Sequence, residues 1–209
     1  MAPQIYDITI PMSASLAGWP GDAPFRFAWT CRKADGESVN VGQVSMSIHT
    51  GTHIDAPFHF SDTGPTVESL SLEPFIGPAR VIDLSGRLSI RRQDLDPFDL
   101  SKTPRVLFRT GVWLDHQRFP AAIPTMARDV PGWLANQGVI LVGVDLPSVD
   151  AIDSKDLPIH HALGENRIAI LESLQLAGVP EGIYELIALP LKIVGADGAP
   201  VRAVLRRDA

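Results

Sequence analysis

Prolines and glycines interrupt this chain along its whole length. The 209 residues include 18 prolines and 17 glycines, which are scattered rather than clustered. Neither residue is well tolerated inside helices or central strands, so this spacing permits only short elements separated by many turns. The pattern predicts a compact, β-rich chain without long linkers, internal repeats or low-complexity tracts. We interpret it as a single domain spanning residues 1–209.

Short apolar segments predict the strands of this domain. Each is bounded by glycine, proline or serine, and together they cover residues 80–84, 105–109, 139–144, 168–171 and 184–189. In the last two thirds of the chain these segments alternate with expected helices. This order predicts a mixed α/β (α+β) domain with more strand than helix.

Two helices are expected between these strands. The better one covers residues 129–136, with Asp129 as a candidate cap, Pro131 in the first turn and Gly138 just past the end. A weaker one covers residues 90–95 and would use Ser89 as its N-cap.

Charge and hydropathy exclude several classes of protein. The formal net charge is -6 and no stretch forms a basic stripe, which argues against a nucleic-acid partner. The longest apolar run, residues 139–144, is too short to span a membrane. The first residues have neither the basic nor the apolar region of a secretory signal, so we expect a cytoplasmic protein. The single cysteine, Cys31, has no histidine nearby in sequence, and we expect a small buried or semi-buried residue rather than a nucleophile.

The histidines are concentrated in two places. Three of the six lie within residues 49–59, and two more are adjacent at 160 and 161. Around the first group, apolar residues take even positions: Val44, Met46, Ile48, Ile54, Ala56, Phe58 and Phe60. Polar residues take the odd ones, including His49, His53, Asp55 and His59. This alternation predicts a strand with its even face in the core and its odd face toward a cavity, interrupted near Gly51 and Pro57.

Imidazoles and a carboxylate on one face suit a divalent transition metal such as Zn, Mn, Fe or Co. Asp55 has two oxygens and could bridge two ions. The alternative is that these histidines are hydrogen-bonded surface or core residues, which is the reading we favour for His116. A purely structural zinc site is less favoured because such sites prefer cysteine, and Cys31 lies elsewhere.

Distant residues are needed to complete such a site. His160 and His161 are the natural candidates, although spacing does not choose between them. Glu172 follows the apolar segment 168–171, and an acid at the end of a buried strand is costly unless it is paired or bound to metal. A solvated strand end remains the alternative for Glu172.

The pattern His-x-Gly-Thr-His-x-Asp-x-Pro-x-His, complete from His49 to His59, resembles the signature of the cyclase-type metal hydrolases. Within that superfamily the chain is most similar to the bacterial kynurenine formamidases (arylformamidases). The similarity covers nearly the whole chain and includes residues 19–22, 38–42, 142–149, 160–161, 170–172, 184–191 and 200–204. It implies the swivelling β/β/α fold of that superfamily.

The resemblance also implies roles for particular residues. His49, His53 and Asp55 would hold one Zn²⁺, His160 a second, and Asp55 and Glu172 would contact both. His59 would donate and accept protons rather than bind metal, and Trp19 would line the substrate pocket. The implied reaction is the zinc-dependent hydrolysis of N-formyl-L-kynurenine to L-kynurenine and formate, in tryptophan degradation, by a homodimer.

Two alternatives stay open at this point. A related enzyme acting on a cyclic amide such as isatin would use the same metal residues. A non-catalytic metal-binding module is the other, and an intact His59 argues against it because His59 is not needed as a ligand.

Overall fold

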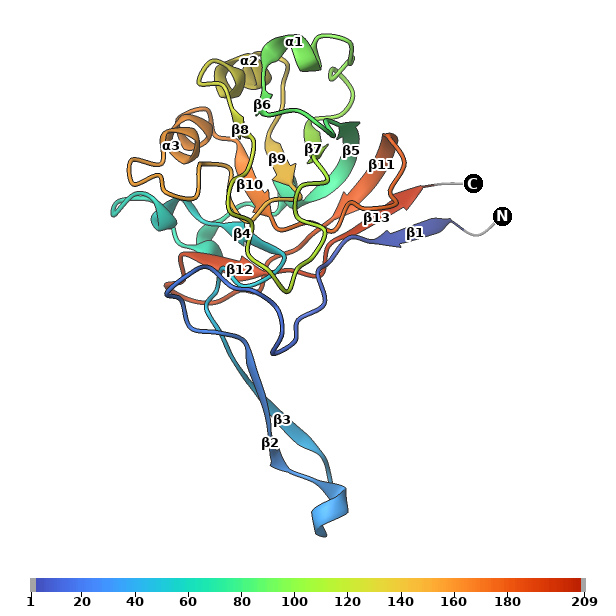
Figure 1. The fold of residues 1–209 in the computed structure, drawn as a ribbon, viewed down its shortest axis with the longest axis vertical. Helices are drawn as coiled ribbons and strands as arrows, with labels where there is room; N and C mark the ends of the chain where they lie inside the picture. The colour runs from blue at the N-terminus through green and yellow to red at the C-terminus, as the bar shows by residue number, and fades with distance from the viewer. Residues whose placement is uncertain (1–2, 208–209) are drawn as a thin grey trace.

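One mixed sheet dominates the structure, a computed structural model that describes residues 3–207 (Figure 1). Its strand order is β1-β13-β11-β5-β7-β9-β10-β4-β12, and the sheet curls into a half-barrel. In that order the strands are Gln4–Asp7, Val204–Arg207, Gly182–Ile187, Ile76–Asp83, Arg105–Arg109, Leu141–Val144, Ala169–Glu172, His53–Asp55 and Gly198–Pro200. The expected mixed, β-rich α/β class is confirmed.

The middle of the sheet is parallel and its flanks are antiparallel. Strands β5, β7, β9 and β10 run in parallel, whereas β4 is antiparallel to both of its neighbours, β10 and β12. Two small sheets stand apart: β2 (Arg26–Cys31) pairs with β3 (Val41–Ser45), and β6 (Ser89–Ile90) with β8 (Thr125–Met126). All five strands predicted from apolar segments are present, with ends shifted by a few residues.

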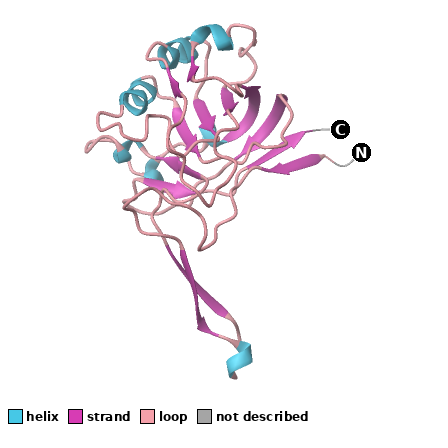
Figure 2. Cartoon of the chain, in the orientation of Figure 1, coloured by secondary structure: helices cyan, strands magenta, loops and turns pink. Residues whose placement is uncertain are grey.

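Both faces of the parallel strands are buried, which explains their near-continuous apolar sequences. Alternate residues of one strand enter different cores: Leu141 packs on the inner, curled face, while Val142 packs on the outer face. Leu171 and Ile170 divide in the same way. The outer face is covered by α1 (Arg92–Leu95), α2 (Val130–Asn136) and α3 (Pro158–Glu165), which gather on one side of the sheet (Figures 1 and 2).

The helix predictions are confirmed for α2 and only partly for α1. In α2, Pro131 lies in the first turn and Gly138 follows the end, although Asp129 makes no side-chain capping bond. The N-cap expected at Ser89 is wrong, because Ser89 pairs with Thr125 in β6. The helix instead begins at Arg92, and the Asp94 carboxylate accepts the backbone N–H of residue 91 at 2.9 Å.

Strands β2 and β3 form an arm that projects from the body, with the 3₁₀ helix η1 (Lys33–Asp35) at its tip (Figures 1 and 2). Both strands are exposed on both faces, and Val44 is 52% exposed. The burial expected for the even face of this strand is therefore wrong along most of its length. Only Ile54 and Ala56 of the even set are fully buried, whereas Phe58 is exposed. Cys31 lies half-buried in the arm, as expected for a non-nucleophile.

The remaining 3₁₀ helices are single turns in the connections: η2 (Pro57–His59), η3 (Val67–Ser69) and η4 (Glu73–Phe75). Within residues 3–207, no helix is both long enough and apolar enough to cross a lipid bilayer.

Strand β12 lies unusually close to β4 because it contains Gly198. A Cβ atom at Gly198 would lie 2.6 Å from the backbone oxygen of Ile54 and 3.3 Å from Cε1 of His49. Neither the strand backbone nor a packed imidazole moves cheaply. Glycine is therefore required where the C-terminal segment closes over the histidine-bearing strand.

We expect Gly198→Ala to lower the free energy of unfolding by more than about 1 kcal/mol, because the new methyl group would overpack the β4–β12 contact. Gly132→Ala is the matched control, since Gly132 lies inside α2 with open space around its Cβ position. That substitution should stabilise the protein by about 0.5–1 kcal/mol. Urea denaturation measures both, and an unchanged midpoint for Gly198→Ala would contradict this account of the strand contact.

Candidate metal centre

Strand pairing brings three of the predicted site residues onto one face of the sheet. His53 is paired with Glu172, and Asp55 with Ile170, across β4 and β10. Because paired residues share a face and alternate residues return to it, the side chains of His53, Asp55 and Glu172 all lie on the side of the sheet that carries α3. The intervening Ile54 points into the inner core and is fully buried. The parity argument therefore holds where β4 is a true strand.

A sharp turn before β4 places His49 beside the same face. Gly51 adopts a left-handed conformation, with φ of 69°, that few other residues would accept. The hydroxyl of Thr52 donates to the backbone oxygen of Ser173 at 2.5 Å and accepts the N–H of Ile10 at 2.9 Å. These bonds attach the turn to the residue that follows Glu172. The interruptions expected at Gly51 and Pro57 are confirmed, since Pro57 opens η2 immediately after β4.

Helix α3 distinguishes the two adjacent histidines. His160 is 2% exposed, and its Nε2 lies 3.4 Å from Oδ2 of Asp55 and 3.6 Å from Oε1 of Glu172. His161 is exposed and points elsewhere, with its ring near Phe60. His116 packs against Trp113 and belongs to no cluster of potential ligands in the described chain. This packing agrees with the structural role that the sequence indicated for His116.

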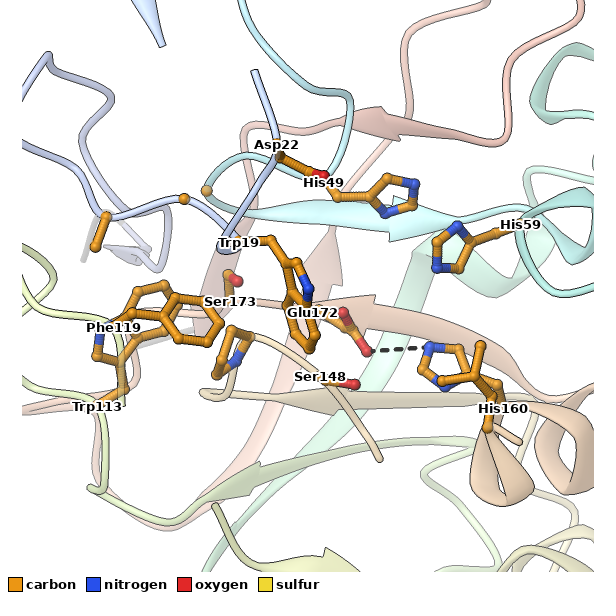
Figure 3. A pocket seen from close by; sticks show the side chains of 15 residues that line it. Trp19, Asp22, His49, His59, Trp113, Phe119, Ser148, His160, Glu172 and Ser173 are labelled. Atoms are coloured by element: carbon orange, nitrogen blue, oxygen red, sulfur yellow. Dashed lines mark ion pairs between the residues drawn. The ribbon is translucent and has the colours of Figure 1, made fainter. Parts of the chain in front are cut away.

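The donor atoms form two groups that share Asp55 and Glu172. Oδ1 of Asp55 lies 3.0 Å from Nδ1 of His49 and 3.3 Å from Nε2 of His53. The other oxygen, Oδ2, faces His160. Glu172 divides similarly, with Oε2 3.6 Å from His53 Nε2 and Oε1 toward His160 (Figure 3). Each carboxylate thus presents one oxygen to each group.

These atoms fit a bound cation better than they fit one another. Among the described residues, both carboxylate oxygens of Asp55 and Nε2 of His53 are buried without a hydrogen-bond partner, because their close contacts lack hydrogen-bonding geometry. A buried, unpaired carboxylate is costly unless a cation compensates for it. Nitrogen and carboxylate donors without cysteine are typical of a catalytic rather than a structural metal site. The residues present therefore fit divalent metal.

The second nitrogen of each buried imidazole is held by the protein. Nδ1 of His53 contacts the backbone oxygen of Gly51 at 2.8 Å, and Nδ1 of His160 contacts Oδ2 of Asp150 at 2.7 Å. Each ring therefore donates on that side, so its neutral form has the electron pair on Nε2, the nitrogen that faces the carboxylates. Asp150 also accepts the backbone N–H groups of Ile159 and His160 at the start of α3.

Sequence reasoning missed Asp150, and it missed Asp197, whose Oδ2 lies 3.0 Å from Nε2 of His49. Asp150 lies six residues past the end of β9 at Val144, in a connection without a regular pattern, so the sequence carried no clear signal for it. Asp197 lies in a glycine-containing turn that also lacks a regular pattern. Only the pairing of β12 with β4 brings it to the histidines.

Burial and mutual contact shift the pKa values of these groups strongly. Burial opposes the charge on Asp55, but His160, His49 and His53 hold the pKa of its carboxyl well below the usual range. Burial and the neighbouring charge of Asp55 raise the pKa of Glu172 to about 7. Burial also disfavours the imidazolium form, yet the surrounding carboxylates raise the pKa of His49 to about 9 and that of His160 to about 10. Without metal, protons supply the positive charge that Asp55 requires.

An aromatic-walled pocket of about 260 Å³ opens onto these donors (Figure 3). Its wall includes Trp19, half-buried, whose ring meets that of Phe119 edge-on at 5.3 Å, and Trp113 completes the aromatic cluster. His49, His160 and Glu172 lie at its other end. Trp19 thus lines the pocket as expected, and Phe119 and Trp113 are additional wall residues that the sequence did not single out.

His59 lies at the rim of this pocket with its side chain 30% exposed. Burial lowers its pKa below the usual 6.5, outweighing the opposing effect of Asp55. The imidazole is therefore neutral at pH 7 and has a free electron pair. A nitrogen of His59 also lies within 4.8 Å of donor atoms of Asp55 and His160. Position alone permits either a ligand or a proton acceptor.

Sequence and fold comparisons agree on the relatives of this chain. The family model described as "Putative cyclase" matches residues 6–151. The chain is 48% identical over 200 residues to the kynurenine formamidase of Bacillus cytotoxicus, covering 96% of both chains. It is 47% identical over 203 residues to that of Bacillus mycoides, covering 97% of both.

Among solved structures, a "predicted metal-dependent hydrolase" from Bacillus stearothermophilus superposes with a TM-score of 0.84 at 30% identity, covering 99% of both chains. Isatin hydrolase A from Ralstonia solanacearum also gives 0.84, at 24% identity, covering 99% of this chain and 92% of its own. At that identity the second likeness shows the fold alone. The architecture is thus shared with a solved metal-dependent hydrolase. The chain belongs to the cyclase family.

We expect metal binding to release protons, because His49 and His160 are protonated at pH 7 in the metal-free protein and only a neutral imidazole binds a cation. Apparent affinity should therefore fall as pH is lowered from 9 to 6. Zinc titration calorimetry in two buffers of different ionisation enthalpy measures the protons released. Identical heats in both buffers would show that the histidines are neutral before binding.

Proposed function

We propose that this chain is a zinc-dependent kynurenine formamidase, which hydrolyses N-formyl-L-kynurenine to L-kynurenine and formate in tryptophan degradation. The observation that carries the proposal is the buried Asp55–Glu172 pair, flanked by three imidazoles, at the end of an aromatic-walled pocket. The identity of 48% to curated kynurenine formamidases over 96% of the chain supports the choice of substrate. The cytoplasm is the proposed compartment. The single cysteine cannot form a disulfide within the chain, so nothing in the sequence points to an oxidising compartment.

In this proposal His49, His53 and Asp55 hold one zinc ion and His160 the second, with Asp55 and Glu172 contacting both. Two carboxylates that each present one oxygen to each group support a pair of ions rather than one. Bound zinc lowers the pKa of water from about 15.7 to about 7 and polarises a carbonyl oxygen. Hydrolysis of an amide at neutral pH needs both effects.

His59 is the proposed proton carrier. Its neutral imidazole at pH 7 accepts the proton of the attacking water, and the imidazolium then donates that proton to the departing aniline nitrogen. The second transfer is necessary because an anilide anion is a poor leaving group. The two proposed ligand groups are complete without His59, and its partly exposed side chain at the pocket rim can exchange protons with solvent; both features support this role.

Trp19 is proposed to bind the aryl ring of the substrate. Its ring and that of Phe119 form an apolar wall opposite the histidines, so an aromatic ring bound there would direct its formamide toward the donor atoms (Figure 3). Aromatic contact and burial contribute on the order of 1–3 kcal/mol to such binding.

The substrate assignment is tested by absorbance assays on metal-free and zinc-reconstituted protein. We expect cleavage of N-formyl-L-kynurenine only after zinc is restored. Turnover of isatin or a cyclic imide in its place would identify the cyclic-amide alternative, which the fold of isatin hydrolase A motivates. A zinc-loaded protein that cleaves no amide would instead indicate a non-catalytic metal-binding module.

His59→Ala should lower kcat by about 10²–10⁴-fold while leaving zinc content unchanged, because the proposal makes His59 a proton carrier and not a ligand. His161→Ala is the matched control, since His161 is an exposed histidine that does not line the pocket. Turnover and metal analysis are measured on the same samples. Loss of zinc from His59→Ala would make His59 a ligand, and full activity would remove it from the mechanism.

A homodimer built through the projecting arm is also part of this proposal. Phe27 and Trp29 stack edge-on at 5.0 Å and are 51% and 50% exposed. A lone two-stranded hairpin is marginally stable in water, and its apolar side chains need a covering surface. Each copy of the chain has an exposed apolar surface that could cover the arm of the other copy. It lies where β11 meets β5 and in the adjoining segments, and it includes Leu72, Ile76, Leu189 and Leu191.

We expect Phe27→Ser combined with Trp29→Ser to sediment at half the mass of the wild-type protein, because the arm loses the apolar surface that holds the second copy. Leu88→Ser is the control, since Leu88 is 94% exposed and belongs to neither surface. Analytical ultracentrifugation distinguishes these cases. A dimer that survives the double substitution would exclude the arm as the interface.

A further inference from the structure

Asp197 is a carboxylate at the centre that the proposed ligand set leaves without a role. It lies in the turn before β12, and its backbone oxygen accepts the N–H of Ala56 at 2.8 Å. The next residue, Gly198, is paired with Asp55 in the sheet. Two backbone attachments to the histidine-bearing strand therefore fix where the Asp197 side chain begins.

One oxygen of Asp197 faces two imidazoles at once. Oδ2 lies 3.0 Å from Nε2 of His49 and 3.7 Å from Nδ1 of His59. The two rings lie 4.0 Å apart, with an angle of 37° between their planes. A carboxylate accepts hydrogen bonds and donates none, so each ring must present N–H on this side to be stabilised by it.

The opposite nitrogen of each ring consequently carries the electron pair, and it faces a different partner in each histidine. With Nε2–H of His49 on Asp197, Nδ1 carries the electron pair and faces Oδ1 of Asp55 at 3.0 Å. With Nδ1–H of His59 toward Asp197, Nε2 carries the electron pair that a proton acceptor needs. One side chain is thus placed to favour a single tautomer in each ring, through a hydrogen bond to His49 at 3.0 Å and through its negative charge 3.7 Å from His59.

We propose that Asp197 is a positioning residue shared by His49 and His59, orienting the first for metal and the second for proton transfer. The inference for His49 rests on the metal centre, and that for His59 rests on the proposed function. Asp150 has the same role for His160, because its carboxylate binds the ring nitrogen that points away from the donor cluster. We infer that Asp197 does this for His49 and His59.

A competing arrangement exists in the same atoms. Donors of His49, His59 and Asp197 lie within 4.8 Å of one another and are themselves suited to a cation. In that arrangement Asp197 would be a ligand and the protein would bind three ions. The 3.0 Å separation of His49 Nδ1 from Asp55 Oδ1 favours the positioning role, because it makes Nδ1 the nitrogen that faces the buried donors and would carry the electron pair once a cation replaces its proton.

The experiment compares Asp197→Ala and Asp197→Asn with Asp129→Ala in the full chain. Asp129 is a suitable control because its side chain caps nothing and does not line the pocket. Zinc dissociation constants come from competition with a chromophoric chelator, zinc content from elemental analysis, and kcat and KM from turnover at saturating zinc. Urea unfolding verifies that each variant is folded.

We expect Asp197→Ala to weaken zinc binding about 10–100-fold and, with zinc restored, to lower kcat by a similar factor while KM stays within about twofold. Asp197→Asn should lie between Ala and wild type, because its amide oxygen still accepts a neutral hydrogen bond. Asp129→Ala should match wild type throughout.

Unchanged zinc affinity in both Asp197 variants would overturn the role for His49, and unchanged kcat at saturating zinc would overturn the role for His59. A wild-type content of three ions that falls to two in Asp197→Ala would make Asp197 a ligand and overturn both. The zinc readout does not depend on substrate. A wild-type protein that cleaves no formamide would therefore refute the proposed function while the test of Asp197 on His49 still stands.

Discussion

Two carboxylates buried side by side are the constraint on which the rest of the structure depends. Asp55 and Glu172 lie on neighbouring strands, 4% and 3% exposed, and no lysine or arginine reaches either one in the described chain. Burying such charges costs several kcal/mol each unless positive charge accompanies them. His49 and His160, whose pKa values are raised to about 9 and about 10, meet this requirement with protons when metal is absent, and a divalent cation would meet it by displacing those protons.

The fold supplies this arrangement by placing a short antiparallel strand at the edge of the parallel strands. β4 is only three residues long, yet it lies between β10 and β12 and so places His53 opposite Glu172 and Asp55 beside Gly198. The parallel strands contribute a base that is buried on both faces, and α3 places the buried side chain of His160 beside Asp55 and Glu172. The loops that carry Trp19 and Phe119 form the pocket wall that a substrate would contact.

Much of this was predictable from sequence because it is local. Alternating polar and apolar residues mark the segment from His49 to His59, and short apolar runs mark β7 and β9. The predicted ligands do lie together in the structure. The arm was missed because β2 and β3 alternate like a half-buried strand, although no part of the described chain covers them. Asp197 was missed because its relation to His49 spans 148 residues and depends on strand pairing. The choice of His160 over His161 likewise required the orientation of α3.

The most direct test of the central claim is to locate the metal by anomalous diffraction at the zinc edge in crystals of the zinc-loaded protein. The account predicts two peaks, one among His49, His53 and Asp55 and the other beside His160, with Asp55 and Glu172 between them and His59 bound to neither. A single peak, or a peak on the outer side of His49 between His59 and Asp197, would contradict it.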